Sequence, residues 1–288
     1  MKRCYIQAIG IVSALGDGID ETRERLMLGD TRGMHIESGW LPDGNSCVGR
    51  VETELPPLPA AFAEDDCRNN RLLAAAFRQI APQVESAKAQ WGSARVAVVI
   101  GTSTSGIAAG EDAMAAKVKR GEFPPSFSYR QQEIGATAPF AARLAGARGP
   151  AYTVSTACTS GAKALIAARR LLELDLCDVA LAGGVDTLCR LTVCGFTALE
   201  SAAPERCNPM SRNRRGTNIG EGAALFILGR ESAAVALVGA GESADAYHLS
   251  APDPAGTAPE AAMRQALAEA GAAPRDIRYV NLHATATQ

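Results

Sequence analysis

The chain has 288 residues, with 29 Lys and Arg against 31 Asp and Glu, which gives a formal net charge of −2. A composition of 47% hydrophobic and 21% charged residues excludes a disordered chain and predicts one large or two medium globular domains. The near-neutral charge argues against a nucleic-acid-binding protein, and no apolar run approaches the ~20 residues of a membrane span.

The cysteines and the first residues indicate the compartment. Eight cysteines are scattered without a CxxC pair and without grouped histidines, so neither a disulfide framework nor a zinc site is predicted. Residues 1–18 lack a small-residue cleavage site, and we interpret them as a first strand and turn rather than a signal peptide. We therefore expect a cytoplasmic protein with mostly buried free thiols and no metal cofactor.

Short apolar runs alternate with helical patterns along the chain, which is typical of an α/β protein. The apolar runs predict strands over 3–12, 95–100, 151–156, 178–183, 223–228, 234–239 and 277–282. The helical patterns predict helices over 19–28, 69–81, 108–120, 136–145, 159–174 and 258–270. In the last helix, Met263, Ala266, Leu267 and Ala270 have the spacing of one buried face.

A faint repeat predicts two similar halves, which we place at 1–233 and 234–288. Each half contains a helix, a strand and a short turn rich in Thr and small residues. These are 69–81, 95–100 and GTSTS (101–105) in the first half, and 258–270, 277–282 and HATAT (283–287) in the second. The chain stops soon after the second turn, so we expect the second half to be incomplete.

Two glycine motifs do not predict a nucleotide site. GAGESA (239–244) follows a strand and matches the dinucleotide pattern, but the residues after it hold two prolines and no helical period. GTSTSG (101–106) has the outer glycines of a phosphate loop but is followed by Ile-Ala, not by Lys and Ser or Thr. The chain also lacks a G-x-S-x-G elbow, which argues against an α/β-hydrolase serine nucleophile.

Cys158 lies at a predicted strand-to-helix junction in GPAYTVSTACTSGAKALIAARRLLELD (149–175). The first helical turns are apolar on nearly all sides, which predicts a helix buried in the centre of the protein. The amides and dipole at its start stabilise a thiolate, so this thiol can act as a nucleophile near neutral pH. The alternative for a cysteine is a small buried apolar side chain. We assign that alternative to Cys4, Cys177, Cys189, Cys194 and Cys207, and place Cys47 and Cys67 in loops or at helix ends.

The segment TACTSG (156–161) resembles the nucleophile motif of the elongating β-ketoacyl-acyl carrier protein synthases. Further segments over essentially the whole chain fall in that family's order and spacing. They are GGVD (183–186), GF-x-AL (195–199), RRGTNIGEGAA (214–224), DAYHLSAP (245–252) and YVNLHATAT (279–287). The resemblance implies the thiolase fold, an α/β fold with duplicated halves in α-β-α-β-α layers that is usually homodimeric.

The resemblance also implies a reaction. Cys158 would accept an acyl group from the phosphopantetheine thioester of acyl carrier protein. His283 occupies the first histidine of the family's His-Gly-Thr-Gly-Thr motif, which assists malonyl decarboxylation and stabilises the enolate. The product would be a 3-oxoacyl-carrier protein, in fatty acid or polyketide and polyene synthesis, formed without a metal or nucleotide cofactor.

Further residues are implied to bind the substrate. Thr285 and Thr287 match the hydroxyls that bind the phosphopantetheine arm. Phe196 matches an aromatic residue that lines the acyl pocket, and Thr104 lies in the loop that faces this pocket. Against the family pattern, both glycines of the histidine motif are alanines, Ala284 and Ala286.

The resemblance further implies a longer chain. The sequence ends before the family's second catalytic histidine, its lysine and the glycine-rich loop that completes the oxyanion hole. The family's usual Phe-Asp and Arg-Asp pairs read Met210-Ser211 and Arg214-Arg215 here. We therefore do not expect residues 1–288 alone to carry out the complete condensation.

Two other functions stay open. One is a coenzyme A-dependent thiolase, whose nucleophile usually lies earlier in a different motif. The other is a non-catalytic subunit of the chain-length-factor type, which forms a heterodimer with an active synthase and typically lacks the cysteine. The expected partners are acyl carrier protein and a second subunit, in a homodimer or a heterodimer. Arginines in 68–71 and 206–215 are interpreted as a solvated surface, or else as a docking patch for the acidic carrier.

Overall fold

The computed structural model describes residues 4–248 and 251–287. Its centre is a mixed sheet with strand order β10-β1-β9-β7-β5-β6, in which β2 also pairs with β1. β5 runs parallel to β6 and β7, whereas β9 runs antiparallel to β1 and β7. The strands are β1 (Cys4–Ser13), β2 (Gly16–Asp17), β5 (Val96–Gly101), β6 (Ala151–Val154), β7 (Val179–Asp186), β9 (Gly222–Gly229) and β10 (Val235–Leu237). The predicted α/β class is confirmed.

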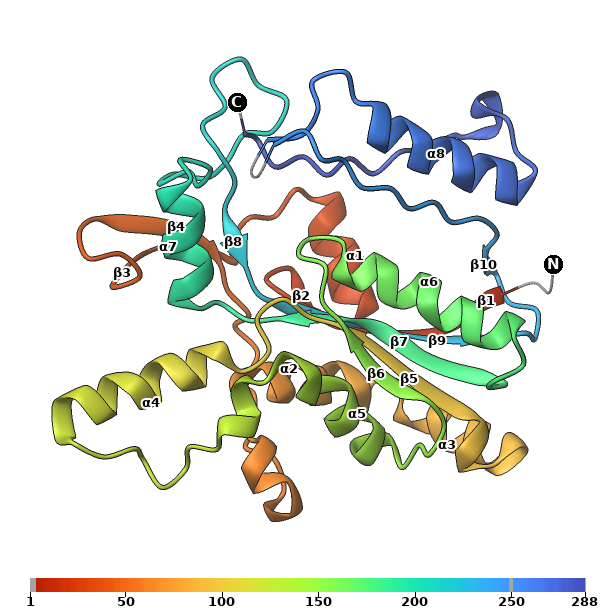
Figure 1. Cartoon of the computed structure of the whole chain (residues 1–288), viewed down its shortest axis with the longest axis horizontal. Helices are drawn as coiled ribbons and strands as arrows, with labels where there is room; N and C mark the ends of the chain where they lie inside the picture. Colours follow the sequence, from red (N-terminus) through yellow and green to blue (C-terminus); the bar gives the residue numbers. More distant parts are fainter. Residues whose placement is uncertain (1–3, 249–250, 288) are drawn as a thin grey trace.

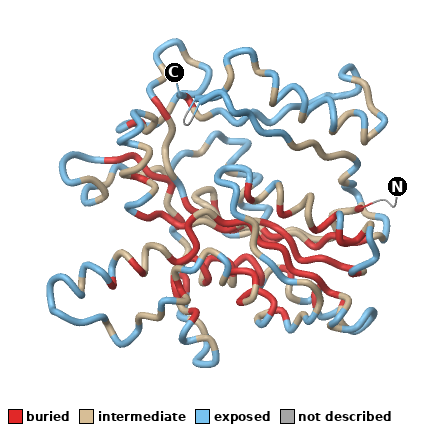
Figure 2. Tube along the Cα trace, viewed as in Figure 1, coloured by how far each residue is buried: buried red, intermediate tan, exposed pale blue. Residues whose placement is uncertain are grey.

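Helices cover both faces of this sheet (Figure 1). α2 (Arg68–Arg78), α3 (Ala81–Trp91) and α5 (Thr137–Ala145) lie on one face, and α6 (Ser160–Glu173) lies on the other. Because both faces are covered, β5 is buried at all six positions, as expected for a central parallel strand. Figure 2 shows the buried residues concentrated along the sheet and the helix faces against it.

A smaller sheet packs beside the main one, with strand order β3-β4-β8. Its strands are β3 (Met34–Ser38), β4 (Asn45–Gly49) and β8 (Ile219–Gly220). Val48 of β4 packs with Leu188 and with Val193 of α7 (Arg190–Ala198) in a separate apolar cluster. The remaining helices are α1 (Ile19–Met27), α4 (Ile107–Arg120), α8 (Thr257–Ala270) and the short turns η1 (Ala60–Asp65), η2 (Ser93–Arg95), η3 (Tyr129–Gln132), η4 (Ile134–Ala136) and η5 (Pro274–Asp276).

The helix predicted over 69–81 is in fact the first of two consecutive helices. α2 ends at Arg78 and α3 begins at Ala81. Pro82 lies in the first turn of α3, where its missing N–H has no cost. None of the described helices has both the length and the apolar character that a membrane span requires.

α8 forms the outermost layer and lies beyond α6 in Figure 1. The prediction of a buried face on this helix is wrong, because none of its residues is buried and Met263 is 58% exposed. α8 packs instead on the backbone after β10, where a Cβ on Gly241 would lie 1.8 Å from the Ala262 carbonyl oxygen. Glycine in GAGESA therefore allows close backbone packing, which accounts for the motif without a nucleotide.

α6 lies between the sheet and the α8 layer, and it is not buried on all sides as predicted. Ala164, Ala168 and Leu172 are buried, whereas Ala162 is exposed. The outer side of α6 meets the α8 layer through charged groups, with Arg169 3.0 Å from Glu269. Charged contacts cover less apolar surface than a packed core, so this side of α6 stays partly exposed.

The segment 277–282 does not form the predicted strand. Its large apolar side chains are exposed, with Tyr279 at 80% and Leu282 at 54%. A strand needs neighbouring strands to satisfy its backbone groups, and no strand of the described chain pairs with these residues. The apolar pattern predicted a strand here, but without a neighbouring strand the segment stays irregular.

Candidate active site

Cys158 lies in the elbow between β6 and α6, at the predicted junction. Its side chain is exposed. The preceding residue, Ala157, has a φ of 52°, a left-handed conformation that residues other than glycine seldom adopt. The elbow therefore presents the thiol at the surface through a locally strained backbone.

The elbow sits directly on the carboxyl ends of two parallel strands. A Cβ on Gly101, at the end of β5, would lie 2.4 Å from the Ser160 carbonyl carbon. A Cβ on Gly184 of β7 would lie 3.2 Å from Gly161 Cα. These glycines let the first turn of α6 approach the sheet, at the strand ends where α/β proteins commonly build their sites.

A second loop, GTSTS, reaches the elbow from the end of β5. Asp186 at the end of β7 holds this loop, since its Oδ1 accepts hydrogen bonds from Ser103 N at 2.7 Å and from Thr104 N at 2.9 Å. Ser103 in turn donates its hydroxyl to the Ala157 carbonyl oxygen at 3.1 Å. The GTSTS loop thus supports the Cys158 elbow.

Thr104 is buried within this network. Its hydroxyl donates to Asp186 Oδ1 at 2.9 Å and accepts from Thr187 N at 3.0 Å. This hydroxyl is engaged internally, as are the backbone N–H and carbonyl oxygen of Thr104, so Thr104 can offer a bound acyl chain only its methyl group. Its role as a wall of an acyl pocket stays a prediction.

Phe196 lies on α7, a helix that the sequence did not predict, and is half-buried. The start of α7 is held by Glu111 of α4, whose carboxylate accepts from Arg190 N and Leu191 N, each at 2.8 Å. This capping interaction comes from 79 and 80 residues away, so local patterns do not reveal it. The acyl-pocket role of Phe196 stays a prediction.

The histidine motif near the end of the chain has an unusual backbone. Ala284 and Ala286 have φ values of 50° and 58°, which is the region that favours glycine. Thr285 lies between these two alanines and Thr287 follows the second, and the hydroxyls of the two threonines lie 3.1 Å apart. The structure thus brings the two threonines together, while their binding of phosphopantetheine stays a prediction.

The same motif is attached to the loop that precedes β8. Gly216 N donates to the Ala286 carbonyl oxygen at 2.8 Å, and Arg214 Nε donates to the Thr287 carbonyl oxygen at 2.7 Å. His283 is exposed. No hydrogen bond joins the side chains of His283 and Cys158 in the part of the chain that the structure describes, so their proximity stays a prediction.

The buried thiols differ from Cys158 in their surroundings. Burial raises the pKa of Cys4, Cys67 and Cys177 to about 11. It also raises the pKa of Cys189, which is buried as predicted. These thiols form little thiolate near neutral pH, so they are poor nucleophiles.

The remaining thiols correct three of the predictions. Cys47 lies on β4 rather than in a loop and is buried there, and desolvation raises its pKa. Cys194 and Cys207 are half-buried rather than buried. Among the eight, only the Cys158 thiol is exposed.

The arginines of 68–71 belong to the structure rather than to an open patch. Arg68 lies 2.5 Å from the buried carboxylate of Glu221, and Arg71 lies 2.6 Å from Asp66. In 206–215, Arg215 lies 3.9 Å from Glu205, with both side chains mostly exposed. A docking role therefore stays a prediction for the second group alone.

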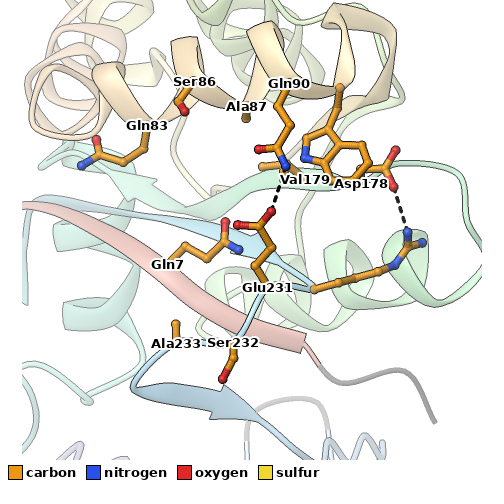
Figure 3. A pocket seen from close by; sticks show the side chains of 12 residues that line it. Gln7, Gln83, Ser86, Ala87, Gln90, Asp178, Val179, Glu231, Ser232 and Ala233 are labelled. Carbon is orange, nitrogen blue, oxygen red and sulfur yellow. Dashed lines mark hydrogen bonds and ion pairs between the residues drawn. The ribbon is translucent and has the colours of Figure 1, made fainter.

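A hollow of about 550 Å³ lies away from the elbow (Figure 3). It is lined near the start of β7 by Asp178 and Val179, whereas Asp186 at the other end of β7 holds the elbow loop. Within the hollow, Gln90 donates to Glu231 at 2.9 Å. An eight-residue strand separates the two places by roughly 23 Å, so this hollow is not part of the Cys158 site.

Residues 4–248 and 251–287 contain no candidate metal site. No group of three or more His, Cys, Asp or Glu side chains gathers there in a way that could hold an ion.

Comparison with known proteins identifies the families of both parts of the chain. Residues 60–234 match the model of the β-ketoacyl synthase N-terminal domain, and residues 234–288 match that of the C-terminal domain. Nodulation protein E of Rhizobium meliloti is 38% identical over 152 residues, which are 50% of this chain and 37% of that protein. The 3-oxoacyl-[acyl-carrier-protein] synthase 2 of Rhizobium meliloti (strain 1021) is 28% identical over 318 residues, which cover 100% of this chain and 75% of that protein. The matched part thus spans little more than a third of the nodulation protein.

A solved structure overlaps with the whole chain. The ketosynthase ApeO from Xenorhabdus doucetiae, in complex with its chain length factor ApeC, gives a TM-score of 0.96 at 45% identity. The overlap covers 100% of this chain and 73% of that chain. A β-ketoacyl synthase from Burkholderia phymatum gives a TM-score of 0.83 at 23% identity, over 100% of this chain and 75% of that chain, which indicates a shared fold. The predicted thiolase-like fold is confirmed.

Proposed function

Because the chain belongs to the β-ketoacyl synthase family, we propose that its protein is a 3-oxoacyl-acyl carrier protein synthase with Cys158 as the acyl acceptor. The observation that carries this proposal is the exposed Cys158 thiol in the β6–α6 elbow, in contrast to the buried thiols elsewhere. Exposure is what a nucleophile needs in order to meet a thioester on a carrier protein.

The first half-reaction is acyl transfer. The Cys158 thiolate attacks the carbonyl carbon of an acyl thioester, and the carbonyl oxygen becomes an oxyanion. Backbone N–H groups, including that of Cys158, stabilise this charge. Collapse of the intermediate releases the phosphopantetheine thiolate, which takes up a proton, and leaves the acyl group on Cys158.

The second half-reaction is condensation. Thr285 and Thr287 hydrogen-bond the phosphopantetheine arm of the malonyl-carrier protein, and His283 donates a hydrogen bond to the thioester carbonyl oxygen. This hydrogen bond stabilises the enolate that forms as carbon dioxide leaves. The enolate carbon then attacks the acyl-enzyme, which expels the Cys158 thiolate and yields the 3-oxoacyl-carrier protein.

The partners in this proposal are acyl carrier protein and a second subunit. The complex of ApeO with its chain length factor supports a heterodimer with a related subunit, and a homodimer is the other assembly. The protein would act in the cytoplasm, with residues 1–233 and 234–288 as the two halves of the fold. The meeting of the two family matches at residue 234 supports this division.

The non-catalytic subunit and the thiolase are less well supported. A chain-length-factor-type subunit does not need an exposed nucleophile, and Cys158 is both present and exposed. A thiolase places its nucleophile in a different motif, and the matched family models are those of β-ketoacyl synthases.

The experiment uses the complete gene product and separates the two half-reactions. His283→Ala should leave acyl transfer onto Cys158 within about twofold, because that step relies on the elbow. Malonyl-carrier protein decarboxylation should fall by about 10², because the variant loses a donor to the developing enolate oxygen. Acyl transfer is followed by mass spectrometry, and decarboxylation by the release of labelled carbon dioxide.

His248→Ala is the matched control, since this exposed histidine accepts a hydrogen bond from Ala251 N at 3.3 Å. We expect it to change neither half-reaction by more than about twofold. Loss of acyl transfer with intact decarboxylation in His283→Ala would reverse the roles proposed here. A non-catalytic subunit would show neither activity before mutation.

A further inference from the structure

The carbonyl oxygen of Ala157 is held by three donors at once. Ser160 Oγ donates to it at 2.6 Å, Ser160 N at 3.0 Å and Ser103 Oγ at 3.1 Å. The two hydroxyls lie 3.3 Å apart, although Ser103 in the loop after β5 and Ser160 at the start of α6 are 57 residues apart in the sequence. Such a concentration of donors on one carbonyl fixes the position of its oxygen.

Ser160 also holds the other side of the elbow. Its hydroxyl accepts a hydrogen bond from Thr156 N at 2.9 Å while it donates to the Ala157 carbonyl oxygen. Ser160 is only 2% exposed, so water competes little for these bonds. Together they hold Ala157 in its left-handed conformation, which is sterically unfavourable for a residue with a side chain.

The held carbonyl belongs to the same peptide group as the N–H of Cys158. This peptide is trans, since the described chain has no cis bond, and a trans peptide is planar with its N–H opposite its C=O. Fixing the carbonyl oxygen toward the buried Ser160 hydroxyl therefore fixes the Cys158 N–H in the opposite direction, toward the exposed side of the elbow.

We propose that Ser160 and Ser103 are positioning residues that aim the Cys158 N–H at the oxyanion formed during acyl transfer. This inference rests on the proposed function, in which that N–H stabilises the oxyanion. Asp186 extends the arrangement, because its Oδ1 holds Ser103 N at 2.7 Å. The loop after β5 and the end of β7 thus align a donor that belongs to the elbow.

Two reactions of the same thiol distinguish the positioning of the Cys158 N–H from a merely structural role in holding the elbow. In the first, the Cys158 thiolate attacks the acetyl thioester of N-acetylcysteamine, forms an oxyanion and releases the N-acetylcysteamine thiolate, which takes a proton from water. In the second, the thiolate displaces iodide from iodoacetamide at a saturated carbon, and no oxyanion forms. Both reactions need an accessible thiolate, and only the first needs the aimed N–H.

We expect Ser160→Ala to lower the acetylation rate constant about tenfold, given that the loss of a whole oxyanion donor costs about 10²–10³. The alkylation rate constant should stay within about twofold. Ser103→Ala, at a partly exposed position, should lower the acetylation rate constant by a smaller factor. Ser160→Thr keeps a hydroxyl at this position and should retain most of the acetylation rate of the unmutated protein. The matched control is Ser243→Ala, which removes a hydroxyl bonded to the Ala258 carbonyl oxygen at 2.6 Å in the α8 layer and should change neither rate.

Peptide mapping after brief reaction gives both rate constants at Cys158. Unchanged acetylation in Ser160→Ala and Ser103→Ala would overturn the positioning role, as would an equal fall in acetylation and alkylation. Acetylation of the unmutated protein at another cysteine, or at none, would overturn the proposed function itself. The two failures are therefore distinguishable.

Discussion

The surroundings of each thiol determine its reactivity, because only the thiolate attacks an electrophile. Burial raises the pKa of Cys67 and Cys177 to about 11, so little thiolate forms there near neutral pH. Cys158 is exposed just before the start of α6, where an electrophile in solution can reach it. The proposed nucleophile thus differs from the other cysteines in its exposure.

Brief treatment with substoichiometric iodoacetamide at pH 7 should therefore label mainly Cys158. Mass spectrometry of the digested protein measures the share of label on each cysteine. The half-buried Cys194 and Cys207 serve as internal references, with less label than Cys158. Preferential labelling of Cys47 or Cys67 would contradict the assignment of the nucleophile.

The sequence indicates the proposed nucleophile more readily than the residues proposed to position it. Cys158 stands out because a strand pattern and a helix pattern meet at it. Ser103 and Asp186 carry no such signal, since they act through hydrogen bonds between segments far apart in the chain. Ser160 bonds within the elbow itself, to Ala157 and Thr156, and no sequence pattern marks those bonds. GTSTSG (101–106) has the outer glycines of a phosphate loop without the residues that must follow them, and its pattern does not indicate a support for the elbow.

At the scale of the elements, charged contacts join α8 to α6. Glu269 accepts a hydrogen bond from Ala240 N at 2.6 Å and pairs with Arg169, a side chain only 5% exposed, at 3.0 Å. The Ala240 N–H, together with the Arg169 guanidinium, holds the pKa of Glu269 below its ordinary value. With no buried residue in α8, these contacts contribute strongly to its docking.

Glu269→Gln should loosen α8. Loss of a charge-assisted hydrogen bond costs about 1.5–3 kcal/mol, so amide hydrogen exchange in α8 should rise about tenfold or more at pH 7. Glu260→Gln is the matched control, because it breaks an exposed pair with Arg264 on the same helix, and such pairs are worth about 0.3–0.5 kcal/mol. Equal exchange in the two variants would contradict this account.

The same pair makes the docking of α8 dependent on pH. Because the pKa of Glu269 is lowered in the folded protein, its contribution is present above the ordinary Glu value of about 4.3 and is lost as the pH falls through the folded value. Hydrogen exchange in α8, corrected for intrinsic rates, should therefore increase in acid for the unmutated protein and much less for Glu269→Gln. An identical acid response in both proteins would contradict this assignment.

Two of the elements that the sequence missed, α7 and β8, depend on distant partners. α7 is capped by Glu111 of α4, and the short β8 exists through its pairing with β4. The strand predicted over 277–282 shows the converse, because an apolar pattern without a paired neighbour stays an irregular segment. Local patterns therefore predicted the long central elements and failed where tertiary contacts determine whether an element forms.

For the whole molecule, the sequence predicted an α/β protein and, through its motifs, the thiolase-like fold. It did not reveal the strand order, in which β9 lies between β1 and β7, because that order depends on long-range pairing. The fold places the β6–α6 elbow, the GTSTS loop and the end of β7 together, so that residues from three segments serve one thiol.

The central claim is that this thiol accepts an acyl group from a carrier protein. The most direct measurement is mass spectrometry of the protein after incubation with hexanoyl-acyl carrier protein, with peptide mapping of the modified residue. We predict one hexanoyl group, on Cys158, and no modification of a Cys158→Ala variant. Acylation at another residue, equal acylation of the variant, or an unmodified protein would contradict the claim.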